Sequence, residues 1–220
     1  MVSFRMGVAM GANGIETDVQ RTKDGVLVLY HDDVLKRTLG LEGSICDYTF
    51  REVESFDAGA FKGEQYRGER IPTLEAFLKE FGNRGLKLAI EIKQRGVEYE
   101  TLDMVRAYLT DGQYTMTSFK FDVIENLAKV EHRPELGFLS REYSEELLDK
   151  LVSLGVVEYC PNASDLTPAV MQMAAQKGLR VRAWGVKTPR LMDKMVDFGV
   201  YGMTVNFPDL LVKRLQHEQC

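Results

Sequence analysis

The sequence predicts an α/β fold in which helices cover a parallel sheet. Short runs rich in β-branched and aromatic residues alternate with helical stretches of about 10–15 residues, a pattern typical of βαβ units. The length of 220 residues is enough for one ordinary domain and reaches the lower end of the range for an α/β barrel. No linker or low-complexity tract divides the chain, so we expect one domain over residues 1–220.

Seven segments have the composition of parallel strands. Helical stretches separate most of them, which favours parallel pairing between neighbours. Seven strands are one fewer than a closed eight-fold barrel needs. The segments lie near residues 15–19, 88–93, 115–119, 136–139, 156–159, 181–184 and 202–205.

Two helices in the second half of the chain have clear start and stop signals. Each begins with a Thr-Pro pair, at residues 167–168 and 188–189, so that a capping hydroxyl precedes a proline at the first helical position. Gly178 and Gly199 follow where a left-handed residue is favoured at a helix end. These signals predict helices over residues 168–177 and 189–198.

Two features interrupt the strand–helix alternation. An Asp-Gly pair at residues 24–25 separates two β-rich runs, residues 14–19 and 26–31, and therefore predicts a β-hairpin. Residues 39–72 are rich in glycine, aromatic and charged residues without a helical period, so we expect a loop-rich insertion near one end of the barrel. Irregular stretches of that length in compact domains are usually functional.

Composition excludes several classes of protein. Hydrophobic residues make up 45% and charged residues 28%, which is typical of a globular chain. The net charge of −5 argues against a nucleic-acid partner. No apolar run approaches the roughly 18 residues of a transmembrane segment. Three widely spaced cysteines, which fit neither a disulfide framework nor a zinc site, favour a reducing, cytoplasmic location; they are Cys46, Cys160 and Cys220.

Acidic side chains occupy one face of two predicted strands. Glu16 and Asp18 are two residues apart and so point to the same side, as do Glu91 and Lys93. Such pairs are commonly solvated surface groups, and an exposed ion pair contributes at most about 1 kcal/mol. Here the opposite strand faces carry Ile, Leu and Val, and both faces of a parallel sheet are normally covered. The pattern favours polar groups inside the barrel mouth, where barrel enzymes keep their sites.

Three carboxylates in one mouth repel each other unless a cation lies among them. Oxygen ligands favour a hard ion, Mg²⁺ or Ca²⁺, and the pattern does not separate the two. Lys93 adds a positive charge, and a divalent ion beside a lysine makes a site for a phosphate. His31 ends the hairpin and is either a general acid or base or a turn residue, while Trp184 is either packing or part of the mouth.

Several short segments share their order and spacing with a known family. They are residues 14–25, 28–32, 37–38, 71–75, 89–93, 117–119 and 181–186. Together they closely resemble the glycerophosphodiester phosphodiesterase family, from the first residue to about Leu211. The resemblance implies a TIM-type (β/α)8 barrel of the phosphodiesterase type with a small insertion after the hairpin. It also implies hydrolysis of small-molecule glycerophosphodiesters to sn-glycerol 3-phosphate and an alcohol, with a divalent metal ion as cofactor.

The resemblance also implies roles for individual residues. By matching position, Glu16, Asp18 and Glu91 are the metal ligands and Lys93 is a phosphate contact. His31 corresponds to one of two histidines that act as an acid–base pair. Trp184, in turn, lines the glycerol or leaving-group side of the family's site.

The start of the chain departs from the family pattern. The family begins with a strand carrying His-Arg-Gly, followed by Glu-Asn-Thr, whereas residues 1–11 here resemble the body of the first helix. The first strand and the partner histidine are therefore missing, and His132 and His217 are expected on the surface. We expect the natural protein to be longer, with an N-terminal signal left open, and the 220-residue chain alone to be less stable or oligomeric.

Two other functions stay open. The first is a catalytically incomplete barrel that binds metal or phosphodiester headgroups without turnover. The second is a phospholipase-like relative acting on intact lipid, for which the insertion offers aromatic residues among many charges; they are Phe50, Phe56, Phe61 and Tyr66. The leaving alcohol and the oligomeric state are not predicted.

Overall fold

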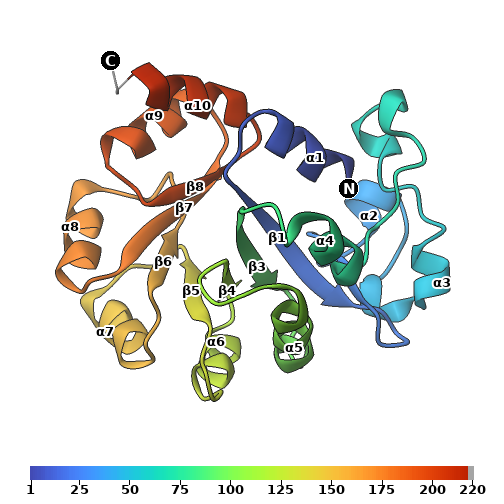
Figure 1. The fold of residues 1–220 in the computed structure, drawn as a ribbon, viewed down its shortest axis with the longest axis horizontal. Coiled ribbons are helices and arrows are strands. Elements are labelled where there is room, and N and C mark those ends of the chain that lie inside the picture. Colours follow the sequence, from blue (N-terminus) through green and yellow to red (C-terminus); the bar gives the residue numbers. More distant parts are fainter. Residues whose placement is uncertain (218–220) are drawn as a thin grey trace.

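A computed structural model describes residues 1–217 of the chain. Its centre is a curled sheet with the spatial order β2-β1-β3-β4-β5-β6-β7-β8, and most helices lie on the outer side of the curl (Figure 1). The strands are β1 Gly14–Arg21, β2 Leu27–Leu29, β3 Lys87–Ile92, β4 Tyr114–Ser118, β5 Glu135–Ser140, β6 Glu158–Pro161, β7 Arg180–Val186 and β8 Gly202–Val205.

The strand pairing confirms the predicted architecture. β1 and β3 to β8 are the seven expected parallel strands, and β2 pairs antiparallel with β1 as the hairpin. Within residues 1–217 the ladder starts at β2 and ends at β8, and no pairing joins β8 to β1. The fold is thus a TIM-type barrel that is open between β8 and β1.

Helices follow the strands in regular alternation. In α8 and α9 the predicted caps form. The Thr167 hydroxyl accepts a hydrogen bond from the Val170 amide, and the Thr188 hydroxyl accepts one from the Leu191 amide. Gly178 and Gly199 have φ of 70° and 67°, as a helix end requires. The helices that accompany the sheet are α1 Val2–Ala9, α4 Leu74–Phe81, α5 Glu98–Tyr108, α6 Phe121–Ala128, α7 Glu145–Ser153, α8 Pro168–Gln176, α9 Pro189–Asp197 and α10 Pro208–His217. No helix among the described residues is long and apolar enough to cross a membrane.

One strand begins later than the composition suggests. Residues 156–159 are the predicted strand, but β6 starts at Glu158. The Val156 amide donates to the Leu151 carbonyl at 3.0 Å, and Gly155 has a φ of 69°. Val156 therefore closes the end of α7 rather than pairing in the sheet.

The insertion over residues 39–72 is mostly irregular, but short helical segments occur along it. They are η1 Ile45–Asp47, α3 Phe50–Val53, η2 Ala60–Lys62 and η3 Glu64–Tyr66, and α2 Lys36–Leu39 leads into the insertion. Capping boxes at Ser44 and Thr49 start two of them. Segments of three or four residues are too short to give a detectable helical period.

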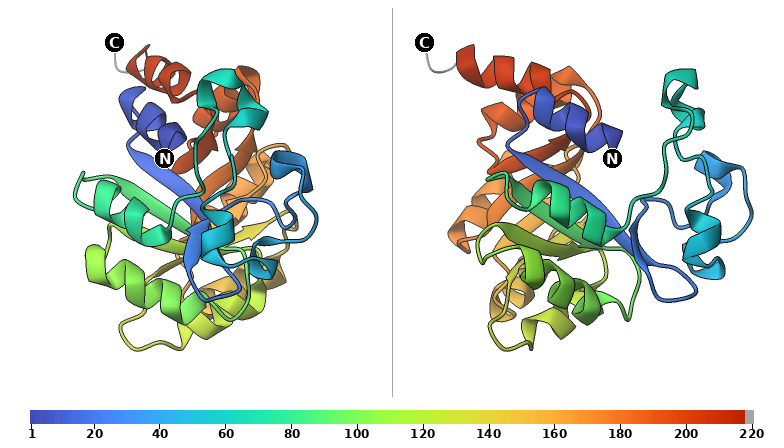
Figure 2. Two further views of the ribbon diagram at one scale, coloured as in Figure 1. Left: turned by 90° about the vertical axis from the view of Figure 1, so that its right-hand side faces the viewer. Right: turned by 45° about the vertical axis from the view of Figure 1, so that its right-hand side comes forward.

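The insertion has its own hydrophobic cluster. Figure 2 shows it projecting from the sheet beside the hairpin. The cluster is separate from the main core and consists of Val28, Tyr30, Leu35, Ile45, Val53 and Ile71. The Leu29 amide donates to the Pro72 carbonyl at 2.9 Å, so the returning chain is bound to β2. This attachment holds the insertion over the end of the barrel.

The two faces of the curled sheet differ in polarity. The outer face packs apolar residues such as Ile90, Met116 and Val181 against the helices. Side chains two residues apart share a face, so the inner face carries Glu16, Asp18, Glu91 and Glu158 together with several threonines and arginines. The main core thus lies between the outer face of the sheet and the helices, and the polar groups are left inside the curl.

Candidate active site

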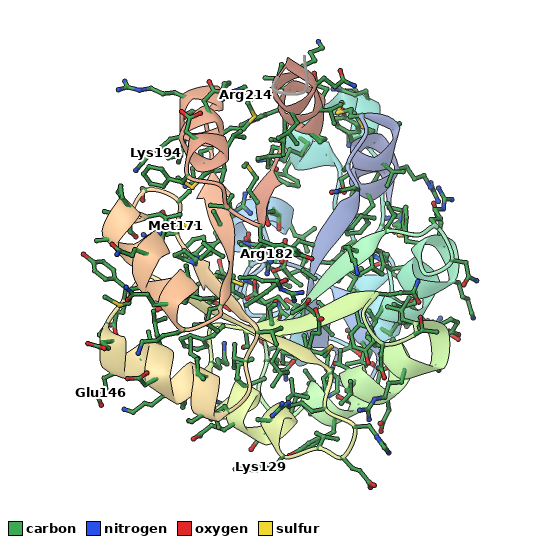
Figure 3. The ribbon with its side chains drawn as sticks, turned by 60° about the vertical axis from the view of Figure 1, so that its left-hand side comes forward. Lys129, Glu146, Met171, Arg182, Lys194 and Arg214 are labelled. Atoms are coloured by element: carbon green, nitrogen blue, oxygen red, sulfur yellow. The ribbon has the colours of Figure 1, made fainter. Side chains whose placement is uncertain are left out.

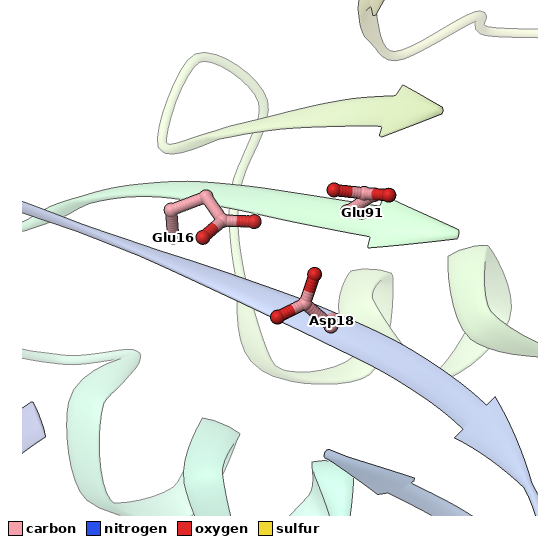
Figure 4. A group of neighbouring side chains, drawn as sticks. All are labelled: Glu16, Asp18 and Glu91. Carbon is pink, nitrogen blue, oxygen red and sulfur yellow. The ribbon is translucent and has the colours of Figure 1, made fainter. Parts of the chain in front are cut away.

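The three predicted carboxylates lie together at the carboxyl ends of β1 and β3. Asp18 is the direct register partner of Glu91, and Glu16 is one strand pleat below it. One oxygen of each carboxylate lies within 4.8 Å of the others, and the three side chains point toward one another (Figure 4). Among the described residues, these three form a group in which each side chain offers one oxygen to a metal ion.

Lys93 completes this cluster. Its Nζ lies 2.7 Å from a Glu91 oxygen and 3.2 Å from Asp18 Oδ1. All three side chains of these ion pairs are largely buried, with at most 13% of their surface exposed. Three carboxylates thus face one ammonium group, and the cluster keeps an excess of negative charge.

Burial or neighbouring charges raise the pKa values of three groups in the cluster. Burial and the neighbouring charges of Asp18 and Glu91 raise the pKa of Glu16 to about 8. Burial also raises the pKa of Glu91, although Lys93 acts in the opposite direction. Burial alone would lower the pKa of Lys93, but the two carboxylates outweigh it and raise that pKa. Burial is the main reason that the pKa values of both carboxylic acids are raised, and the neighbouring carboxylates add to it.

These residues fit a hard divalent cation. All the converging donors are carboxylate oxygens, which Mg²⁺ and Ca²⁺ prefer. Asp18 Oδ1 is buried and has no hydrogen-bond partner in the described structure, although the Lys93 ammonium is nearby. A cation among the three oxygens would supply the missing positive charge and satisfy this atom.

His31 stands at the rim of the same mouth. The Tyr30 amide donates to the Asp18 carbonyl at 3.0 Å, which fixes the end of the hairpin beside β1. Gln20 lies on the same face as Asp18, and its amide donates to the carbonyls of Tyr30 and Asp32 at 2.8 and 2.9 Å. The backbone around His31 is therefore held on both sides. The His31 side chain is 70% exposed and free to contact a ligand.

A carboxylate orients the His31 ring. Asp32 Oδ1 lies 2.9 Å from His31 Nδ1. Arg37 donates two hydrogen bonds to Asp32, from Nε at 2.8 Å and from a terminal nitrogen at 2.7 Å. Burial opposes ionisation of Asp32, but the bonds from Arg37 and His31 outweigh it and lower its pKa. Asp32 thus stays ionised and can accept the Nδ1 proton of His31, in which case Nε2 carries the free lone pair of the ring.

Trp184 also lies at the mouth. Its indole nitrogen donates to the Cys160 carbonyl at 3.0 Å, which explains its partial burial. Phe119 contacts it edge-on, with ring centroids 5.0 Å apart. Arg141 lies over the Trp184 ring at 4.9 Å, and Lys93 lies over Phe119 at 5.6 Å. The aromatic pair therefore joins the carboxylate cluster to the β5–β7 side of the rim.

A hollow of about 430 Å³ lies next to the carboxylate cluster. Gln20, Lys93 and Lys120 line its barrel side, and the insertion contributes Ser44 and Cys46. This volume falls in the range of small-molecule sites, about 300–1,000 Å³. The insertion thus forms one wall of a recess that opens beside Lys93.

A second charged group on the inner face was not found from the sequence. Glu158 of β6 pairs with Arg182 of β7 at 3.2 Å and with Arg180 at 3.4 Å. Arg180 also pairs with Glu135 of β5 at 2.5 Å. Figure 3 shows Arg182 inside the curled sheet. The spacing of residues 180, 182 and 184 on one strand face was the available signal, as it was for Glu16 and Asp18.

The remaining histidines and cysteines are either exposed, buried or outside the described side chains. The His132 side chain is 86% exposed, as expected. Cys160 is buried, and burial raises its pKa to about 12. The side chain of His217 and the whole of Cys220 lie outside the part that the structure describes.

Comparison with known proteins identifies the family. The model of the glycerophosphoryl diester phosphodiesterase family matches residues 1–210. The chain belongs to this family. The glycerophosphodiester phosphodiesterase of Caldanaerobacter subterraneus subsp. tengcongensis is 29% identical, over 96% of this chain and 89% of its own. The chain is therefore related to enzymes that hydrolyse glycerophosphodiesters.

Solved structures of the family have the same fold. An Oleispira antarctica phosphodiesterase, crystallised with the product sn-glycerol-3-phosphate, aligns with a TM-score of 0.87 at 22% identity. The alignment covers 97% of this chain and 90% of that one. The Thermotoga maritima glycerophosphodiester phosphodiesterase aligns with a TM-score of 0.77 at 25% identity, over 96% and 88% of the two chains.

Proposed function

We propose that the chain catalyses metal-dependent hydrolysis of glycerophosphodiesters to sn-glycerol 3-phosphate and an alcohol. The observation that carries this proposal is the convergence of three carboxylates on Lys93 at the barrel mouth. Glu16, Asp18 and Glu91 would hold Mg²⁺ or Ca²⁺. Membership of the family supports the reaction class, and the product bound to the Oleispira antarctica enzyme supports the identity of the phosphate product.

The bound cation would lower the pKa of a coordinated hydroxyl and neutralise charge on the phosphate. Lys93 binds a non-bridging phosphate oxygen through its ammonium, which the carboxylates already hold at the mouth. His31 transfers a proton to or from a reacting oxygen through Nε2, while Asp32 fixes the ring at Nδ1. Trp184 contributes an apolar wall that keeps water from one side of the substrate.

Binding without turnover is the competing proposal. Among the side chains that the structure describes, His31 is the histidine placed at the mouth, and His132 lies elsewhere on the surface. A phosphodiester hydrolysis needs proton transfer at both the attacking and the leaving oxygen. One histidine must then serve both steps, or a metal-bound water must replace the second group.

The test is release of sn-glycerol 3-phosphate from glycerophosphoglycerol, with EDTA, Mg²⁺ or Ca²⁺, for the unmodified chain, Glu16→Gln and His31→Gln. Cation-dependent release that both substitutions reduce by at least about 100-fold supports catalysis. Cation binding through Glu16 with no release from the folded chain supports the binding proposal. Release that is unchanged in EDTA and in Glu16→Gln contradicts the proposed metal site.

A further inference from the structure

We propose that the hollow beside Lys93 receives the leaving alcohol and favours alcohols that carry an anionic group. This inference rests on the proposed function, because it assigns the part of the substrate that lies beyond the phosphate. The hollow begins at Lys93, so a phosphate held there directs one of its two ester groups into the recess. Its volume of about 430 Å³ accommodates a small phosphorylated polyol.

The lining of the hollow is positively charged. Three cationic side chains, Lys93, Arg95 and Lys120, face it, against one carboxylate, Asp33. Lys93 is already paired with the carboxylate cluster, and Arg95 is paired with Asp122 at 2.5 Å. Lys120 forms no ion pair with any residue of the described chain. Its ammonium group is therefore the one in this lining that a ligand anion can pair with at no cost to an existing bond.

The neutral groups of the lining suit a polar ligand. Gln94 accepts the Arg21 amide through Oε1 at 3.0 Å, which leaves its NH₂ group for donation. Ser44 lies on the opposite wall, where its hydroxyl already donates to Asp47 at 2.9 Å and can accept a hydrogen bond from a ligand hydroxyl. An amide donor beside a free ammonium is suited to binding phosphate or carboxylate oxygens. Lys93 and Arg95 are balanced by their carboxylate partners, so Lys120 is the lining cation that acts on the charge of a bound alcohol, and Asp33 is the one carboxylate of the lining.

The aromatic pair reinforces this selectivity. A quaternary ammonium group binds over open aromatic faces. At this mouth Lys93 lies over Phe119 and Arg141 lies over Trp184. A protein cation therefore already lies against one face of each ring, which leaves less aromatic surface for a choline headgroup. Phe119 and Trp184 do not line the hollow itself, so the charge preference within it depends on Lys120.

The experiment compares three substrates that differ in the charge of the leaving alcohol. They are glycerophosphocholine, glycerophosphoglycerol and bis(glycerophospho)glycerol, whose leaving alcohols are cationic, neutral and anionic. The variant is Lys120→Glu, and its matched control is Lys129→Glu at the other end of α6. Lys129 lies on the outer side of the molecule, as Figure 3 shows, so that its substitution changes net charge equally without touching the hollow.

We expect kcat/KM of the unmodified chain to be highest for the anionic substrate and lowest for the choline ester. Lys120→Glu should lower the anionic-to-choline ratio about tenfold, because opposite and like charges a few ångströms apart differ by this order at a partly exposed site. Lys129→Glu should leave that ratio unchanged. Equal ratios in both variants, or a preference of the unmodified chain for choline, would overturn the inference.

A binding measurement separates this inference from the proposed function. Cys46 is exposed on the wall of the hollow, so its alkylation by iodoacetamide reports occupancy without turnover. Inositol 1-phosphate should slow alkylation of the peptide that contains Cys46, choline at equal concentration should not, and Lys120→Glu should remove the protection. If no substrate is hydrolysed, the proposed function is wrong. Slower alkylation of Cys46 by inositol 1-phosphate would still support the hollow as an anion site. Absence of protection contradicts the inference whatever the turnover.

Discussion

The inner face of the sheet carries two charged groups that differ in balance. At the carboxyl ends of β1 and β3, three carboxylates face one ammonium, which we call the mouth cluster: Glu16, Asp18, Glu91 and Lys93. Across β5 to β7, two carboxylates face two guanidinium groups, which we call the paired network: Glu135, Glu158, Arg180 and Arg182. Both groups are enclosed by the same curled sheet.

The two groups differ in their balance of charge. The paired network has as many guanidinium groups as carboxylates, and each carboxylate accepts at least one guanidinium contact, although Arg180 Nε and a terminal nitrogen of Arg182 are buried without a hydrogen-bond partner. The mouth cluster has two carboxylates with raised pKa values and one buried oxygen with no hydrogen-bond partner. Buried charge that the protein leaves unbalanced marks a functional position, whereas balanced charge is expected to act in folding.

Substitution in the mouth cluster should give the largest effect on activity. We expect Asp18→Asn to reduce kcat/KM by about 1,000-fold or more, because a metal ligand and a neighbour of Lys93 are lost together. The free energy of unfolding of the metal-free protein should stay the same or increase, since one of three crowded charges is removed. Steady-state kinetics and urea unfolding in EDTA measure the two effects. Activity within tenfold of the unmodified chain would show that the cluster is structural.

Substitution in the paired network should give the opposite pattern. Glu158→Gln leaves the buried Arg182 without its carboxylate, which we expect to lower the free energy of unfolding by about 3 kcal/mol. The kcat of the folded fraction should change less than about threefold, because Glu158 is not placed at the mouth. A loss of activity at unchanged stability would show that the paired network acts in catalysis, and the contrast with the mouth cluster would then be wrong.

The pH dependence of stability tests the same contrast. The pKa of Glu16 is raised from 4.5 to about 8, so the native state binds more protons than the unfolded state between these values. Stability of the metal-free protein should therefore fall as pH rises through this window and be fully retained below it. Unfolding in EDTA at several pH values measures this slope. Glu16→Gln should reduce the slope of stability against pH. An equal slope in that variant would show that another titrating group causes the dependence.

The smallest effect is expected at the exposed rim. Arg37→Met removes both hydrogen bonds that hold Asp32 beside His31. We expect kcat to fall about three- to tenfold with little change in KM, because the ring loses orientation and not its proton-transfer group. The pH profile of kcat should shift as well. A change confined to KM would indicate that Arg37 contacts substrate directly.

Much of the fold could be predicted because it is encoded in local patterns. The Thr-Pro and Gly pairs around α8 and α9 mark both helix ends, and the Asp-Gly pair marks the hairpin. The carboxylate cluster could be predicted from period-two spacing on β1 and β3, since side chains on adjacent parallel strands meet when their register aligns. That register itself is set by helix packing, and the sequence does not display it.

Other features depend on contacts between distant segments. The pairing of Glu158 with Arg182 joins residues 24 positions apart, so the spacing on β7 could place Arg182 on the inner strand face but could not identify its partner. The lining of the hollow combines residues of the insertion with residues that follow β3 and β4. The short helices of the insertion are fixed by capping boxes and by their own hydrophobic cluster rather than by a period.

The separate hydrophobic cluster of the insertion affects local unfolding of the molecule. Because the apolar side chains of this cluster pack mostly against each other, we expect the insertion to unfold locally as one cooperative unit while the sheet stays intact. Amide protons there should exchange with solvent together, and ahead of those in β3 to β7. If the hollow binds the leaving alcohol as proposed, mutations in the insertion would change its wall with little effect on the stability of the sheet. Substrate specificity would then depend on a part of the chain that tolerates change largely independently of the carboxylate cluster.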